Sequence, residues 1–179
     1  MATLNLGTQD EIAANSRICA AFSGTASADD CDLYEELIQQ YETVRCYCRD
    51  NPAPEFIPLL LNSFGNGTGW GVYQCVEDAF RSYSSNEVIP HLQQALISPI
   101  RSVRYWAAEI AANFPSSELL SQLTDLLNDE NSDVRIAALI ALSPFDPQII
   151  NPIFLRHLEI ETDSDITDLI KNQLSGFDL

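Results

Sequence analysis

The feature that most constrains the fold of this chain is a stretch of sequence that occurs twice at a fixed offset. Residues 88–114 and residues 119–145 align with an offset of 31 residues. The matched pairs are Leu92 and Leu123, Leu96 and Leu127, Val103 and Val134, Arg104 and Arg135, and Ala107 and Ala138. Matched apolar positions at a constant period are typical of stacked helical repeats.

Within each repeat, the apolar residues of the second half follow the spacing i, i+3, i+4, i+7, i+8 and i+11. This spacing places them on one face of a helix. The pattern begins three times along the chain, at Val72, Val103 and Val134. The sequence therefore predicts an all-α protein, a right-handed α-α superhelix of about ten helices.

The predicted superhelix is one compact domain with two parts. Residues 1–55 are expected to form an N-terminal helical cap, which ends at the helix-breaking sequence Asn51-Pro52-Ala53-Pro54. Residues 56–179 are expected to contain the repeats. The third copy, residues 134–145, is apolar almost all round, which predicts a helix covered on two sides. The last unit is polar from Glu161 to Asp168, as expected of a capping repeat.

The charge of the chain bears on its partners. Nine basic residues stand against 26 acidic ones, for a net charge of −17. Nucleic acids and anionic membranes bind through basic residues, so we expect neither as a partner. A basic protein would be complementary, although such a charge can also serve solubility alone. The N-terminus has acids where a signal peptide needs a basic start and an apolar run, so the protein is expected to be cytoplasmic.

The period, the helix pairs and the repeated Val-Arg at the start of the second helix resemble HEAT repeats, especially the short phycobilisome-lyase type. This resemblance covers about residues 56–174. It implies an aspartate six residues before the arginine, with the two residue types paired along the stack as a ladder. Asp129 stands six residues before Arg135 and fits this pattern. Ser98 occupies the matching position before Arg104, and Tyr73 replaces the arginine one repeat earlier, so the expected ladder of Arg104, Asp129 and Arg135 is incomplete.

A second resemblance is to small bacterial HEAT-like proteins. It lies in Gly69-Trp70-Gly71-Val72-Tyr73-Gln74 and in the segments VIPHL and SVRYWAAEIAA. Several such proteins serve as immunity or adaptor proteins beside secreted toxins. The resemblance implies a cytoplasmic protein that blocks or escorts one partner.

Three stretches are candidates for ligand or metal chemistry. The glycine-rich segment from Gly65 to Gly71 lacks the lysine of a phosphate loop, so it is either a binding loop that presents Trp70 or a turn with Trp70 tucked under a repeat. The five cysteines do not show the spacing of a zinc-binding motif. Residues 129–133 are acidic but lack the glycine of a calcium-binding loop, so the start of a helix is expected there. We expect neither a metal nor a cofactor.

Catalysis has no visible basis in the sequence, and the protein is not expected to be an enzyme. His91 and His157 have no matched nucleophile or acid, and both are expected to be partly exposed polar residues. The resemblance to HEAT repeats implies that the second helices line the concave side of the stack. The function predicted is protein–protein interaction through this acidic concave surface. The alternative is a bilin-lyase-like protein that handles a tetrapyrrole or a phycobiliprotein. The residues expected to contact a partner are Trp70, Tyr73, Glu77, Tyr105 and Glu109.

Overall fold

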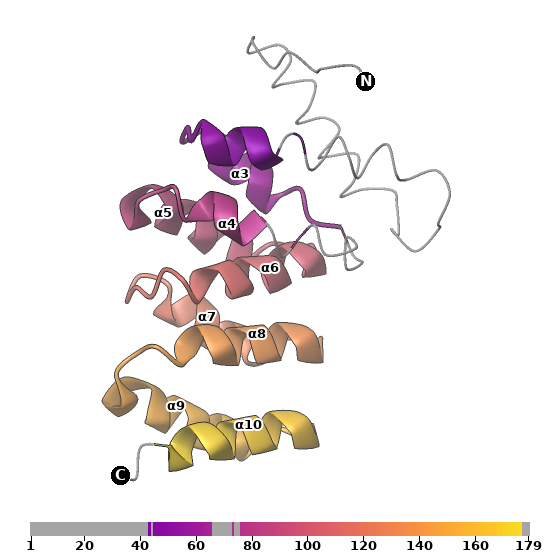
Figure 1. The fold of residues 1–179 in the computed structure, drawn as a ribbon. Helices are drawn as coiled ribbons and strands as arrows, with labels where there is room; N and C mark the ends of the chain where they lie inside the picture. Colours follow the sequence, from indigo (N-terminus) through magenta and orange to yellow (C-terminus); the bar gives the residue numbers. More distant parts are fainter. Residues whose placement is uncertain (1–42, 44, 66–72, 74–75, 177–179) are drawn as a thin grey trace. The chain divides into compact units, whose positions relative to one another are not determined.

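The computed structural model describes residues 43, 45–65, 73 and 76–176 of the chain (Figure 1). Within these residues every regular element is a helix, so the all-α prediction is confirmed there. The helices are α3 (Phe56–Leu61), α4 (Val76–Phe80), α5 (Ser85–Leu96), α6 (Arg101–Ala111), α7 (Leu120–Leu126), α8 (Ser132–Leu142), α9 (Pro147–Leu158) and α10 (Ser164–Ser175). In this part of the chain, no helix is long and apolar enough to cross a membrane.

The chain divides into two compact units, residues 1–91 and residues 92–179, and α5 spans the boundary between them. The boundary expected after residue 55 stays a prediction. In the second unit, α6, α8 and α10 follow one another in one layer (Figure 1). Helix α8 packs against α6, α7 and α10, and α9 packs against α10. Consecutive helices thus form pairs, as expected of a repeat solenoid.

The second helices of the repeats meet through the apolar stripe that the sequence predicts. All six stripe positions of α6 and its C-terminal turn are buried, from Val103 to Phe114, and so are the five of α8 from Val134 to Leu142. Ile166 and Ile170 continue the stripe on α10 with no exposed surface. Many stripe positions are alanine, and small side chains allow neighbouring helices to pack closely. This shared core packs successive repeats against one another.

Side-chain caps determine where α8, α9 and α10 begin. Asn131 accepts a hydrogen bond from the Val134 N–H at 3.2 Å and caps α8. Asp163 caps α10 in the same way through the N–H of Asp165, at 3.0 Å. Asp146 caps α9, where proline follows at the first helical position. The acidic run at residues 129–133 is therefore a helix start, as the sequence predicts.

The described part of the first unit is organised by aromatic side chains. Tyr83 lies in the core, and its hydroxyl accepts a hydrogen bond from the Ala53 N–H at 3.3 Å. This bond connects the proline-containing segment that follows residues 45–50 to the turn that follows α4. The structure describes α4 from Val76, and Tyr73, which the apolar pattern places within this helix, lies in a turn. Trp70 and most of the glycine-rich segment lie outside the described residues.

Candidate functional site

Two arginines on successive second helices each bind a carboxylate from the following repeat. The Arg104 Nε lies 2.7 Å from Asp129 Oδ2, and its Nη2 lies 3.2 Å from Oδ1. The third guanidinium nitrogen, Nη1, donates to the Ser98 carbonyl oxygen at 2.9 Å. Both side chains of the pair are largely covered, with 13% and 6% of their surface exposed. A two-point contact of this kind fixes the relative position of the two repeats.

The same arrangement recurs one repeat later with a different acid. Arg135 Nε and Nη2 donate to the two carboxylate oxygens of Glu161, at 2.9 and 3.2 Å. Its Nη1 donates to the Asp129 carbonyl oxygen at 3.0 Å. Each arginine thus binds the carbonyl six residues before it and the carboxylate of the next repeat. We call Arg104, Asp129, Arg135 and Glu161 the arginine ladder.

Glu161 is the most heavily bonded member of the arginine ladder. Burial alone would raise its pKa, but hydrogen bonds from the Asp163 N–H, Arg135, His157 and the Thr162 N–H lower the pKa to about 2. Glu161 belongs to the polar stretch that the sequence assigns to a capping repeat, yet its side chain is only 3% exposed. At Asp129, burial likewise opposes ionisation, but the Arg104 hydrogen bond and the Asn131 N–H bring the pKa below its usual value.

His157 is a buried member of the same cluster. Only 6% of its surface is exposed, and its Nε2 lies 3.1 Å from Glu161 Oε2. The expectation of a partly exposed histidine is therefore wrong for His157. The repeat offset explains why, because His157 stands 31 residues after Leu126 and 62 after Ala95, which are both buried. The histidine occupies a core position and satisfies its nitrogen with the neighbouring carboxylate.

Of the residues predicted to contact a partner, two lie on α6. Tyr105 and Glu109 are both half-buried, and they share a helix face because they are four residues apart. The Tyr105 ring packs edge-on against Trp106, with ring centres 5.1 Å apart. At the equivalent positions of α8, one repeat later, stand Ile136, half-buried, and Ile140, 45% exposed. Helix α8 therefore still shows apolar surface, although the sequence predicts cover on two sides.

The second helices of this unit also carry exposed carboxylates. The Asp133 side chain on α8 is 63% exposed and lies 3.9 Å from Arg101 on α6, and the Asp168 side chain on α10 is 73% exposed. We call this set the second-helix face. It consists of Tyr105, Glu109, Asp133, Ile136, Ile140 and Asp168. Aromatic and aliphatic side chains among acids are a composition suited to binding a protein with basic residues.

The other residues predicted to contact a partner belong to the first unit, and they differ in burial. Tyr73 is 2% exposed, its ring packs edge-on against Phe64, and its hydroxyl accepts the Gly65 N–H at 2.9 Å. The expectation that Tyr73 contacts a partner is therefore wrong, because its side chain belongs to the core. Glu77 is half-buried in the first turn of α4, and partial burial raises its pKa. Trp70 lies outside the described residues.

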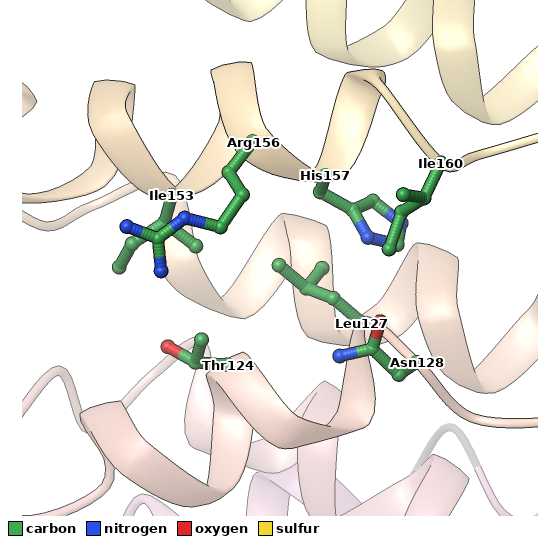
Figure 2. Close-up of a pocket in the computed structure, with 7 residues that line it drawn as sticks. All are labelled: Thr124, Leu127, Asn128, Ile153, Arg156, His157 and Ile160. Carbon is green, nitrogen blue, oxygen red and sulfur yellow. The ribbon is translucent and has the colours of Figure 1, made fainter.

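A hollow between α7 and α9 is a feature that the sequence does not predict. Figure 2 shows the side chains that surround it, and its volume is about 150 Å³. Its lining residues are Thr124, Leu127, Asn128, Ile153, Arg156, His157 and Ile160. Among the residues described, no three histidine, cysteine or acidic side chains gather as a metal site would require.

Comparison with known protein families matches residues 89–172 to HEAT repeats. This segment begins within α5 and ends within α10, so it contains the arginine ladder and the second-helix face. Searches among curated proteins and among solved structures find no match for the chain. The sequence-based identification of HEAT repeats is confirmed for residues 89–172.

Proposed function

Because residues 89–172 form HEAT repeats, we propose that the protein is a non-catalytic module that binds a basic protein partner through the second-helix face. HEAT repeats generally act as helical scaffolds for protein binding. The observation that carries the proposal is the composition of this face. Half-buried Tyr105 and exposed Ile140 offer apolar contact area, while Glu109, Asp133 and Asp168 offer negative charge.

The charge of the whole chain supports a basic partner. A net charge of −17 repels acidic proteins at long range and accelerates encounter with basic ones. Asp129 and Glu161 are neutralised within the arginine ladder. The charge available to a partner therefore comes from exposed acids outside the ladder. Within the protein-binding class, we propose a toxin-neutralising immunity protein or an adaptor.

A pull-down tests this proposal. The tagged protein is incubated with lysate of the native host at about 50 mM and about 300 mM salt, which changes the screening of charges between two proteins. We expect a basic protein to be captured at the lower salt and released at the higher. A coloured, pigment-bearing capture would instead favour the tetrapyrrole alternative. Failure to capture any protein at either salt would contradict the proposal.

Variants show whether the capture uses the second-helix face. Glu109→Lys combined with Ile140→Asp should abolish capture while the far-UV circular dichroism stays helical. Glu130→Lys is the control for the charge reversal at Glu109, because Glu130 is exposed and lies in the turn before α8 rather than on that face. Equal capture by both variants would place the contact elsewhere. Glu77 and Trp70 remain further candidates, and Glu77→Lys would test the first of them in the same assay.

A further inference from the structure

The hollow between α7 and α9 is suited to one apolar side chain. Leu127, Ile153 and Ile160 supply its apolar lining, and Thr124 and Asn128 supply polar groups on the α7 side (Figure 2). A lined space of about 150 Å³ corresponds to a small aromatic ring or a branched aliphatic side chain. The hollow is thus too small for a tetrapyrrole but large enough for a leucine or phenylalanine side chain.

The helix beside the hollow carries an apolar stripe that faces outward. Ile149, Ile153, Arg156 and Ile160 follow the spacing i, i+4, i+7 and i+11, which is one helix face continued into the following turn. Ile149 is 46% exposed and Ile160 is 64% exposed. Ile160 lines the hollow, and Ile149 lies on the same helix face. Exposed aliphatic side chains gathered on one face are typical of a surface that another molecule covers.

Arg156 sets the charge of this surface. The other basic residues of the second unit, Arg101, Arg104, Arg135 and Lys171, each have a carboxylate within ion-pair distance. Among the residues that the structure describes, Arg156 has no such carboxylate. It lies in the last turn of α9, where a positive charge interacts favourably with the helix dipole. The dipole accounts for a basic residue there, but it leaves the guanidinium donors available.

We propose that the α7–α9 hollow binds a short segment of a partner protein that presents an apolar side chain and, within one helical turn of it, a carboxylate. The apolar side chain enters the space between Leu127, Ile153 and Ile160. The carboxylate accepts hydrogen bonds from the Arg156 guanidinium, which Figure 2 shows on the side of the hollow where Thr124 lies.

This surface is distinct from the second-helix face, because it is formed by first helices of the repeats. It extends the proposed protein-binding function but does not depend on the second-helix face. The two surfaces also differ in charge, since one offers carboxylates and the other a guanidinium. A single partner, or two different partners, would therefore need segments of opposite charge to occupy both.

A phage-displayed library of short random peptides, selected against the immobilised full-length protein, tests the proposal. We expect the enriched peptides to share leucine, phenylalanine or tryptophan within four residues of aspartate or glutamate. The most enriched peptide is then synthesised with a fluorophore and titrated by fluorescence polarisation. Arg156→Glu should weaken its binding by at least about tenfold, the usual loss for one charge-assisted contact.

Matched variants separate this contact from general charge effects. Lys171→Glu makes the same change in net charge on α10, away from the hollow, and should leave the affinity within about twofold. Arg156→Gln provides a milder second variant, which keeps the test informative if Arg156→Glu unfolds the protein. Glu109→Lys should not weaken binding of the peptide. The test of the hollow therefore gives the same answer whether or not the second-helix face binds a partner.

Three results would overturn the proposal. Absence of any enriched peptide would do so, as would enriched peptides that lack an acidic residue near the apolar one. Equal affinity for the wild type, Arg156→Glu and Arg156→Gln would also exclude the guanidinium from the contact. An equal loss on Lys171→Glu would show that only the net charge matters, which is likewise incompatible with the proposed site.

Discussion

Replacing Glu161 with glutamine should destabilise the protein at neutral pH, and about half as much at about pH 3. The two carboxylate oxygens accept five hydrogen bonds, from Nε and Nη2 of Arg135, from His157 and from the N–H groups of Thr162 and Asp163. Glutamine has one acceptor oxygen and turns an NH₂ group towards these donors. The substitution therefore removes the counter-charge of the Arg135 guanidinium, which is largely shielded from solvent.

The magnitude follows from the pKa of Glu161. A fall from 4.5 to about 2 on folding corresponds to about 3 kcal/mol of stability at neutral pH. Solvent screening near the surface reduces this, so we expect a loss of about 2 kcal/mol. Because the folded-state pKa is lowered, the stabilisation is present above the unfolded pKa. It is lost as the pH falls through the folded pKa, between about pH 5 and pH 2.

Urea unfolding monitored by circular dichroism measures this effect at about pH 7 and about pH 3, on either side of the unfolded pKa. The difference between wild type and Glu161→Gln should shrink to about half at the lower pH. Glu159→Gln is the control, because Glu159 is exposed two residues away and its loss should cost less than about 0.5 kcal/mol. Equal effects of the two substitutions at neutral pH, or a loss that does not change with pH, would refute the reasoning.

Three further predictions concern other contacts. In a double-mutant cycle, Arg104→Ala and Asp129→Ala should show a coupling of about 2 kcal/mol in urea unfolding, whereas additive losses would mean that the pair is not coupled. Tyr73→Phe removes the acceptor of the buried Gly65 N–H and should lower the free energy of unfolding by about 1–2 kcal/mol; unchanged stability would contradict the contact. Burial raises the pKa of Glu77 above its unfolded value, so its ionisation costs stability as the pH rises through the folded pKa. Glu77→Gln should therefore raise the thermal midpoint at about pH 7 and not at about pH 3, and a lower midpoint at neutral pH would argue against this.

The repeat architecture can be predicted from the sequence because it depends on a periodic apolar pattern. Val103, Val134 and their stripe neighbours are buried where the pattern places them. A fixed offset also predicts burial at positions where the residue type alone does not. His157 is polar, but the 31-residue offset aligns it with buried Leu126, and its burial could have been predicted from that alignment.

Other features escape sequence reasoning for identifiable physical reasons. Glu161 stands 32 residues after Asp129, not 31, and it is a glutamate, so an inserted residue and a longer side chain conceal its equivalence. Tyr73 was expected on a helix surface, but it lies in a turn, and its side chain is buried in the core. The hollow beside Arg156 depends on how α7 and α9 pack, which no single helical pattern specifies.

The most direct test of protein binding through the second-helix face is hydrogen–deuterium exchange on the complex with the captured partner. We expect slower exchange in peptides that cover Arg101–Ala111 of α6 and Ser132–Leu142 of α8, compared with the protein alone. Peptides of α7 should exchange as before if the partner uses only this face. Slower exchange confined to α7 and α9, or no change in α6 and α8, would contradict the account.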